Sequence, residues 1–388
     1  LARIRMKPMR TLSGVTTVTV LTKPHPCPGD CIFCPTDVRM PKSYIPDEPG
    51  AARALENDFD PFRQVKARLD SLEATGHPTD KVELLILGGT WDSYPREYQS
   101  WFIQRCLDAM NEVESTDLQQ AQAWNENAGH RNVGLVIETR PDRITPAELA
   151  WLRGLGVTKI QMGAQSLDED ILKLNRRGHS AAQTLEATAL LRAAGYKTVL
   201  HWMPNLLGAT PATDRTDFIR LWDGYCPDEI KIYPTQLLES AELFRYWQNG
   251  EYQPYSMDEL ISLIADLKPT VPEYCRINRI IRDIPSYHVV EGNRRTSLRQ
   301  DAREEMLRRG NVCRCIRCRE VRGQQVEAGQ LRLVDFTYDA AWAEEHFLQF
   351  VTPDNRIAGY LRLSLPDEHN PARRARMPQD ALERQQAL

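Results

Sequence analysis

The sequence predicts an α/β protein whose first two thirds form a partial barrel of six parallel strands, followed by a smaller and more β-rich part. The barrel is predicted by short apolar runs that alternate with amphipathic helical stretches, which is typical of consecutive strand–helix units. A change of pattern beyond Tyr255 predicts where the barrel ends. Strand-like runs after Gly323 predict the second part.

Six apolar runs and six helical stretches define the predicted barrel. The strands are expected at residues 14–21, 82–87, 133–138, 159–163, 198–203 and 229–233. The helices are expected at residues 62–75, 96–113, 146–155, 168–175, 181–194 and 213–222. Active sites of such barrels lie on the loops that follow the carboxyl ends of the strands, so polar and glycine residues at those points are candidates for function.

Past the barrel the chain is predicted to continue as a linker and a second domain. We expect a barrel domain at 1–255, an Arg-rich linker at 256–322 that begins with a helix, and a β-rich domain at 323–388. The candidate strands of this last domain lie at 331–337, 345–351 and 357–365, with a turn at 353–355 between the last two. Because the chain starts at Leu1 and stops in a helix-like segment at 378–388, both ends are expected to be incomplete.

The composition excludes a membrane span and argues against a disulfide framework. No run of eighteen apolar residues and no signal peptide is present, which predicts a protein of the cytoplasm. Six of the nine cysteines fall into two groups of three, and the others are Cys106, Cys226 and Cys275. This grouping favours metal binding in a reducing compartment.

Positive charge is concentrated in two places although the formal net charge is −4. Residues 276–322 carry thirteen arginines against six acidic residues, and residues 1–23 carry five basic residues and no acidic one. Such concentrations are typical of a surface that binds a polyanion. A solvated Arg-rich face explains the charge equally well.

The first cysteine group, Cys27, Cys31 and Cys34, has the spacing Cys-x3-Cys-x2-Cys. One short loop can place these three thiolates around a corner of an iron–sulfur cluster, and because such clusters normally take four thiolates, one iron is left for an exchangeable ligand. The alternative is a zinc knuckle, in which His25 is the nearby candidate for a fourth ligand. Zinc sites usually close with four ligands, commonly in Cys-x2-Cys pairs, so we favour the cluster.

The second group, Cys313, Cys315 and Cys318, is tighter and predicts zinc. Thiolates in this arrangement need one further partner. Cys275 is the expected fourth ligand, and His288 is the alternative. Three exposed thiols within six residues would invite oxidation, which argues against a group without a metal.

Several further blocks, taken in order, resemble one family. The cysteine spacing resembles the radical S-adenosylmethionine (radical SAM) signature. From Met6 to about Leu365 the chain is similar to the catalytic subunit of Elongator and its single-chain bacterial and archaeal relatives. The matching blocks lie at 31–35, 80–91, 136–142, 163–166, 175–179, 201–205, 231–235 and 282–285.

The resemblance implies a fold and a set of ligands. It implies a TIM-like radical SAM barrel joined through a zinc-bearing linker to the first strands of an α+β acetyltransferase domain of the GNAT type. A 4Fe-4S cluster on Cys27, Cys31 and Cys34 would bind S-adenosylmethionine, and Lys81 would contact acetyl-CoA. The implied ligands of S-adenosylmethionine are Gly88, Gly89, Thr90, Glu138, Gln165 and Arg177.

The resemblance also implies a reaction and its partners. The enzyme would use acetyl-CoA to add a carboxymethyl-type group to C5 of the wobble uridine of tRNA, alone, as a homodimer or with Elongator-like subunits. The arginines expected to contact tRNA are Arg276, Arg279, Arg282, Arg294, Arg295 and Arg299. The family's glycine-rich acetyl-CoA loop is not found after Gly359. Two alternatives therefore stay open: a protein-lysine acetyltransferase with a structural iron–sulfur site, and a tRNA-binding fragment without catalysis.

Overall fold

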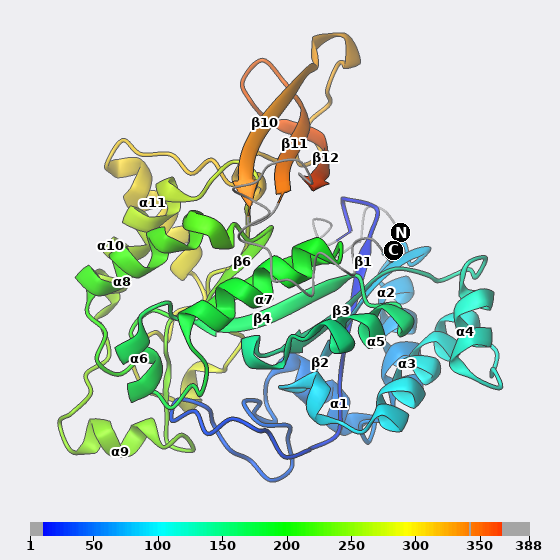
Figure 1. Ribbon diagram of the computed structural model, residues 1–388, viewed down its shortest axis with the longest axis horizontal. Helices are drawn as coiled ribbons and strands as arrows, with labels where there is room; N and C mark the ends of the chain where they lie inside the picture. The colour runs from blue at the N-terminus through cyan, green and yellow to red at the C-terminus, as the bar shows by residue number, and fades with distance from the viewer. Residues whose placement is uncertain (1–10, 341–342, 367–388) are drawn as a thin grey trace.

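A parallel sheet of seven strands forms the larger part of the protein in the computed structural model, which describes residues 11–340 and 343–366 (Figure 1). The sheet has the order β1-β2-β3-β4-β5-β6-β8, and every neighbouring pair is parallel. Its strands are β1 Thr16–Leu21, β2 Lys81–Leu87, β3 Arg131–Thr139, β4 Lys159–Gln165, β5 Lys197–Trp202, β6 Glu229–Ile232 and β8 Arg276–Arg279. Since β1 and β8 are the two edges, the barrel is open on one side.

Helices surround this sheet, and most of them cover its outer face (Figure 1). They are α1 Pro49–Glu56, α2 Pro61–Ala74, α3 Arg96–Asn111, α4 Leu118–Asn125, α5 Pro146–Gly154, α6 Glu169–Leu174, α7 Ala181–Ala193, α8 Pro211–Arg220, α9 Leu243–Gln248, α10 Met257–Leu267, α11 Leu298–Arg308 and α12 Ile316–Arg319. Capping residues determine where several helices begin. The Asp60 side chain accepts from the N–H of Arg63 at the start of α2, and Ser180 with Gln183 forms a capping box at the start of α7. No helix among the described residues is long and apolar enough to cross a membrane.

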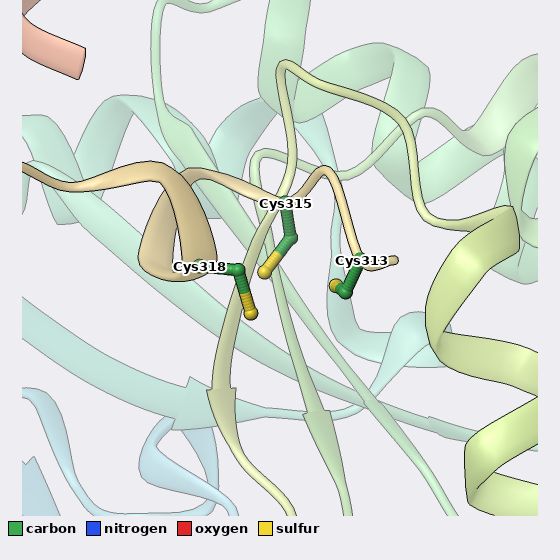
Figure 2. Close-up of side chains that lie close together, drawn as sticks. All are labelled: Cys313, Cys315 and Cys318. Atoms are coloured by element: carbon green, nitrogen blue, oxygen red, sulfur yellow. The ribbon is translucent and has the colours of Figure 1, made fainter. Parts of the chain in front are cut away.

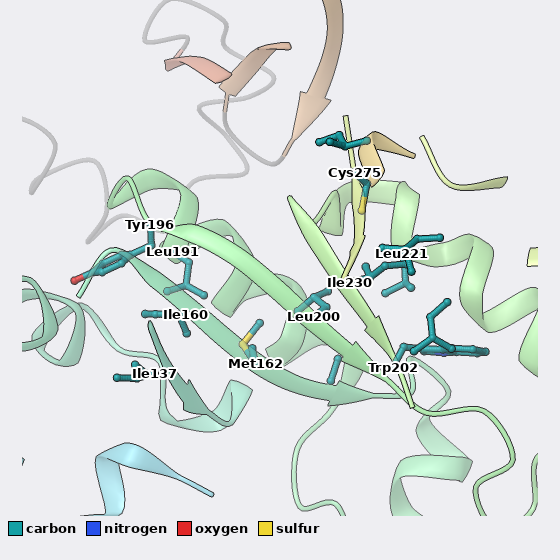
Figure 3. Close-up of a cluster of buried hydrophobic side chains, with 14 of the residues drawn as sticks. Ile137, Ile160, Met162, Leu191, Tyr196, Leu200, Trp202, Leu221, Ile230 and Cys275 are labelled. Carbon is teal, nitrogen blue, oxygen red and sulfur yellow. The ribbon is translucent and has the colours of Figure 1, made fainter. Parts of the chain in front are cut away.

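The strands alternate between an apolar outer face and a polar inner face. Ile160 and Met162 on β4, Leu200 on β5 and Ile230 on β6 are buried in the core between the sheet and the helices (Figure 3). Because successive side chains of a strand point to opposite faces, the residues between them point into the barrel. This alternation makes the interior of the barrel largely polar, with Leu21, Leu85 and Leu87 as apolar side chains that also line it.

The six predicted strands are confirmed, and the sheet has a seventh that was not predicted. β8 lies inside the predicted Arg-rich linker, with the sequence Arg-Ile-Asn-Arg, and only Ile277 is a buried apolar side chain of its four residues. The two arginines are neutralised by ion pairs, Arg276 with Glu320 and Arg279 with Asp283. Charged residues that are paired in this way give no apolar run, so the strand could not be recognised from its pattern.

Two smaller antiparallel sheets complete the described chain. β7 Leu237–Leu238 pairs with β9 Val289–Glu291. The three strands predicted for the β-rich part are confirmed as β10 Arg332–Ala340, β11 Ala343–Val351 and β12 Ile357–Pro366. The predicted tail helix at 378–388 lies outside the described residues, as do Arg3, Arg5, Lys7 and Arg10 of the basic N-terminal segment.

The β10–β12 sheet packs against the amino ends of the barrel strands. Arg362 on β12 forms an ion pair with Asp228 at 2.9 Å, and Asp228 immediately precedes β6. Arg362 also donates to the carbonyl of Tyr274 at 2.7 Å, and Tyr274 lies two residues before β8. The rings of Tyr274 and Tyr338 stack with their centroids 3.8 Å apart. In Figure 1 the sheet projects above the barrel, whereas the blue loop after β1 lies at the lower edge. The sheet therefore lies at the end of the barrel opposite to the loop that carries the first cysteine group.

Candidate active site

A cavity of about 530 Å³ occupies the interior of the barrel. Its walls come from the inner faces of the strands, the loops at their carboxyl ends and the segment before α1. The residues predicted to hold a cluster and S-adenosylmethionine that line it are Cys27, Cys31, Cys34, Gly89, Thr90, Glu138, Gln165 and Arg177. The structure thus brings these residues, which are spread over 150 positions of the chain, to one cavity.

The loop that carries the first cysteine group is anchored by apolar side chains. Ile32 and Phe33 are buried in a satellite core with Leu206 and Leu243, and the N–H of Leu243 donates to the carbonyl of Ile32 at 2.8 Å. Cys31 and Cys34 are close enough for their thiols to share a hydrogen bond. This hydrogen bond lowers the pKa of Cys31, and the charge of Arg177 lowers it further. Burial acts in the opposite direction, and the net result is a pKa of about 5. A lowered pKa favours the thiolate, which is the form that binds metal.

Arg177 and Gln165 form the wall beside Cys31. The Arg177 guanidinium donates from Nη1 to Sγ of Cys31 at 3.2 Å and from Nη2 to the carbonyl of Gly163 at 2.6 Å. A side chain at position 163 would begin 2.7 Å from this guanidinium, so only glycine leaves room for it. Three buried polar atoms here have no partner among the described residues: Nε of Arg177, Oε1 of Gln165 and Nη1 of Arg140. Such atoms fit a site whose ligand satisfies them.

The glycine pair after β2 has a conformation that other residues rarely adopt. Gly88 has φ +139° and Gly89 has φ +92°, and a Cβ at position 88 would lie 1.8 Å from Oγ1 of Thr22. Thr90 follows, with its Oγ1 3.5 Å from Sγ of Cys27. The pair therefore brings bare backbone to the edge of the cavity, next to the cysteine loop.

Replacing Gly88 with alanine is expected to lower the free energy of unfolding by about 1–3 kcal/mol, because of its φ angle and the contact with Thr22. Urea unfolding followed by circular dichroism measures the change. Gly129 is the matched control, because it has no positive φ and no atom within 4 Å of its Cβ position. Equal stability of the Gly88→Ala and Gly129→Ala variants would contradict the prediction.

A polar layer lies deeper in the barrel. Oε2 of Glu138 accepts from the hydroxyl of Tyr44 at 2.7 Å, and its Oε1 lies 3.9 Å from Nζ of Lys231. Lys231 also donates to Gln161, whose Oε1 lies 3.1 Å from Nε2 of His201. No role was predicted for Gln161, His201, Lys231 or Arg140. A polar residue in the middle of an apolar strand, as in Lys-Ile-Gln-Met and Glu-Ile-Lys-Ile, was the signal that could have found two of them.

The side chains of the second cysteine group lie close together (Figure 2). Among the described residues, Cys313, Cys315 and Cys318 are the one group whose candidate ligand atoms all lie within 4.8 Å of one another. Hydrogen bonds from Cys313 and Cys315, and the charges of Lys268 and Arg299, lower the pKa of Cys318. Three thiols of this kind suit a metal ion.

The two residues predicted as a fourth ligand are not in this group. Cys275 is fully buried in the main core (Figure 3), although its carbonyl accepts from the N–H of Ile316 at 3.0 Å. His288 lies 2.6 Å from Asp47 and is on the segment before β9. The structure thus gives three ligands of the predicted zinc site and leaves the fourth open.

The six arginines predicted to contact tRNA differ in their surroundings. Arg294 and Arg295 are exposed. Arg294 donates to the carbonyl of Val290, and Arg295 lies 3.6 Å from Asp301. The other four are less exposed and are held by contacts inside the protein: Arg276 pairs with Glu320, Arg279 with Asp283 and Arg282 with Glu48, and Arg299 donates to the carbonyl of Ile277. Lys81 is exposed at the start of β2, at the end of the barrel away from the cysteine loop.

Comparison with known proteins gives two family matches and close relatives. A model described as the radical SAM superfamily matches residues 25–217, and one described as the radical SAM C-terminal domain matches residues 227–308. The chain is 43% identical over 378 residues to a tRNA uridine(34) acetyltransferase of Methanocaldococcus infernus, covering 94% of this chain and 71% of the relative. A protein of the same name from Dehalococcoides mccartyi is 44% identical over 364 residues, with 92% and 79% covered.

A more distant relative and a solved structure belong to the same group of proteins. Elongator complex protein 3 of Homo sapiens is 34% identical over 379 residues, which cover 93% of this chain and 69% of that protein. The solved structure of the archaeal Methanocaldococcus infernus Elp3 with an N-terminal deletion superimposes with a TM-score of 0.81 at 39% identity, covering 91% of this chain and 78% of that one.

Proposed function

The chain belongs to the radical SAM family of the tRNA uridine(34) acetyltransferases and Elongator complex protein 3, and from this membership we propose how its own residues serve the modification of the wobble uridine. The enzyme acts on tRNA, and its family implies a 4Fe-4S cluster, S-adenosylmethionine and acetyl-CoA. The product we propose is a carboxymethyl-type group at C5 of the uridine. The observation that carries the assignment of residues is the convergence of Cys27, Cys31, Cys34, Gly89 and Arg177 on one cavity.

The residues present fit the cluster and S-adenosylmethionine. When bound, these groups supply a carbon-centred radical by reductive cleavage of an S–C bond. Cys27, Cys31 and Cys34 would hold the cluster, and the Arg177 guanidinium, which donates to Cys31, would stabilise its negative charge. The bare backbone of Gly88 and Gly89 would accept from the amino group of S-adenosylmethionine. Glu138, Thr90 and the unpartnered atoms of Gln165 and Arg177 would bind its other polar groups.

The acetyl-CoA region is proposed at the other end of the barrel. Lys81 lies at the start of β2, and the β10–β12 sheet packs against that end through Arg362. We propose that this sheet is part of an acetyltransferase domain of the GNAT type and that Lys81 contributes to acetyl-CoA binding.

We propose zinc for the second cysteine group. Its three thiols are held against β8, because Arg299 donates to the carbonyl of Ile277 and the N–H of Ile316 donates to the carbonyl of Cys275. The metal would stabilise the segment that carries the Arg-rich surface. With a fourth protein ligand unassigned, water or a residue outside the described ranges would complete a tetrahedral site.

Charge reversal at Arg294 and Arg295 is expected to weaken tRNA binding. Both side chains are exposed, so they are the two of the six predicted arginines best able to contact phosphates. Replacing both with glutamate should lower the affinity and reduce the slope of log affinity against log salt concentration by about two, one for each lost phosphate contact. Fluorescence anisotropy of labelled tRNA at several salt concentrations measures both quantities.

A control with the same change in net charge is available on α2. Arg63 and Lys66 have side chains that are 53% and 46% exposed, and replacing both with glutamate should leave the salt slope unchanged. If the two double variants reduced the slope equally, the arginines at 294 and 295 would not define the tRNA surface.

The product of S-adenosylmethionine cleavage tests the function. Purified protein with a reconstituted and reduced cluster is expected to release 5′-deoxyadenosine when tRNA is present, measured by liquid chromatography under anaerobic conditions. Release in the presence of tRNA excludes a merely structural iron–sulfur site. If no 5′-deoxyadenosine forms with any tRNA, the proposed assignment of the cavity is wrong.

A further inference from the structure

A second buried cation lies beside the first cysteine group, and the proposed function gives it no role. Arg140 follows the end of β3, lines the cavity and is only 4% exposed. Its Nε donates to Asp142 at 2.9 Å, and its Nη2 donates to the carbonyl of Arg177 at 2.8 Å. These two hydrogen bonds hold the guanidinium in one orientation, next to the residue that contacts Cys31.

The Nη1 end of this guanidinium lies against the loop between Cys27 and Cys31. A Cβ at position 29 would lie 2.3 Å from Nη1 of Arg140 and 3.6 Å from Sγ of Cys31, so both atoms border the same small space. Gly29 has no positive φ, so its backbone does not by itself require glycine. The room that the guanidinium needs therefore explains the glycine in this loop.

Nη1 of Arg140 is a buried donor with no partner among the described residues. A buried N–H group without an acceptor costs free energy, and the cost is larger when the group is charged. The fold thus keeps an unpartnered donor and a positive charge next to the thiols that would hold the cluster. Such a cost is expected where the group serves a ligand.

The buried charges next to Cys31 are positive. Asp142, the ionic partner of Arg140, has a side chain that is 23% exposed, against 5% for Arg140, so water screens the carboxylate more than the guanidinium. Arg177 adds a second guanidinium, which donates to Cys31. The acidic residue of the cysteine loop, Asp30, has a side chain that is 86% exposed. Solvent therefore weakens the nearby negative charges and leaves the positive ones.

We propose that Arg140 raises the reduction potential of the cluster on Cys27, Cys31 and Cys34, and thereby controls how readily S-adenosylmethionine is cleaved. This inference rests on the proposed function and assigns the control to a residue that is not a ligand of the cluster. Reduction takes one electron from a low-potential donor such as dithionite and adds one negative charge to the cluster. A buried positive charge stabilises the reduced form more than the oxidised form, because little water screens the attraction.

Replacing Arg140 with glutamine tests the proposal, because it removes the charge. The equilibrium constant for one-electron reduction of the reconstituted cluster, without S-adenosylmethionine, is expected to fall about tenfold, which makes the potential more negative by about 59 mV. An anaerobic redox titration followed by electron paramagnetic resonance of the reduced cluster measures the potential.

Arg176→Gln is the matched control for the loss of charge. Arg176 precedes Arg177, and its side chain is 43% exposed and pairs with Glu242 at 2.8 Å. Because water screens this charge, its loss should leave the potential unchanged. Equal potentials in Arg140→Gln and Arg176→Gln would overturn the proposal.

A conservative variant separates the charge from a structural effect. Lysine keeps the positive charge but cannot reproduce the bonds that the guanidinium makes to Asp142 and Arg177. Arg140→Lys should therefore restore the reduction constant to within about threefold of that of the unaltered protein. The same potential in Arg140→Lys and Arg140→Gln would mean that the charge has no part in the effect.

A substitution in the cysteine loop gives an independent test. Gly29→Ala should displace the guanidinium, because the new Cβ would lie 2.3 Å from Nη1. It should lower the reduction constant in the unaltered protein and have less effect in Arg140→Gln, where the shorter side chain leaves this space free. Equal effects in the two backgrounds would contradict the proposal.

Failure of this inference is distinguishable from failure of the proposed function. If the unaltered protein assembles a complete cluster and releases 5′-deoxyadenosine, but Arg140→Gln has an unchanged potential, the inference alone is wrong. If the unaltered protein assembles no cluster, the proposed function is wrong and the inference with it.

Discussion

Replacing Cys31 with alanine is expected to abolish cluster assembly and, with it, all release of 5′-deoxyadenosine. Cys31 is the central thiol of the loop, and it accepts from Arg177 and shares a hydrogen bond with Cys34. With two thiolates left, the cluster would lose a required ligand and the Arg177 guanidinium would lose its partner. The expected result is loss of the iron–sulfur absorbance and a fall in cleavage below detection, measured after anaerobic reconstitution.

Cys106 provides the matched control for this substitution. It is fully buried on α3, and burial raises its pKa, so it is neither a metal ligand nor a reactive thiol. Cys106→Ala should cost some stability through the cavity it leaves but retain a full cluster and normal cleavage. If Cys31→Ala kept the iron content of the unaltered protein, Cys31 would not be a ligand.

Replacing Asp228 with asparagine is expected to lower the free energy of unfolding by about 3–5 kcal/mol. Asp228 is 3% exposed and pairs with Arg362 at 2.9 Å and with Arg192 at 3.8 Å. It also accepts from the N–H of Thr198 at 2.8 Å. Asparagine removes the charge and leaves Arg362 without its carboxylate at the junction of barrel and β10–β12 sheet. Urea unfolding at pH 7 measures the loss.

The same residue should make stability depend on pH. Burial alone would raise the pKa of Asp228, but Arg362 and Arg192 hold it below its ordinary value. Because the pKa is lower in the folded than in the unfolded protein, the contribution is fully present above the unfolded value of about 4 and is lost as the pH falls through the lower folded value. Asp228→Asn should therefore reduce the loss of stability in this acid range.

An exposed aspartate tests whether burial is the cause. Asp70 pairs with Lys66 at 2.7 Å on the surface of α2, and its side chain is 55% exposed. Asp70→Asn should cost no more than about 0.5 kcal/mol and leave the acid range unchanged. A loss in Asp228→Asn as small as that in Asp70→Asn would show that the buried ion pairs contribute little.

The sequence predicted those parts of the fold and site whose residues lie close together or repeat. Six barrel strands were found because apolar side chains recur along each of them, as Ile160 and Met162 do. The two cysteine groups were found because each comes from one short loop. Such local patterns report strand position and ligand spacing directly.

Other parts depend on contacts between distant residues. β8 could not be predicted, because it has a single buried apolar residue and the partner of Arg276 is Glu320, which only the fold brings near. Cys275 has the right residue type for zinc but is buried in the main core, outside the group of three thiols. The layer of Gln161, His201 and Lys231 exists because β4, β5 and β6 are neighbours, and the hydrogen bonds that hold it together cross between strands.

Along each barrel strand, side chains that pack in the core alternate with side chains that line the cavity. Residues that stabilise the fold are therefore different from those that face a ligand. On β1, Val18 and Val20 are fully buried in the core, whereas Thr17 and Thr19 between them line the cavity. Substitutions at the inner positions change what the interior binds and leave the packing of helices on the sheet intact. Redesign of the interior for another ligand would therefore start from inner positions such as Thr17 and Thr19 and leave the scaffold unchanged.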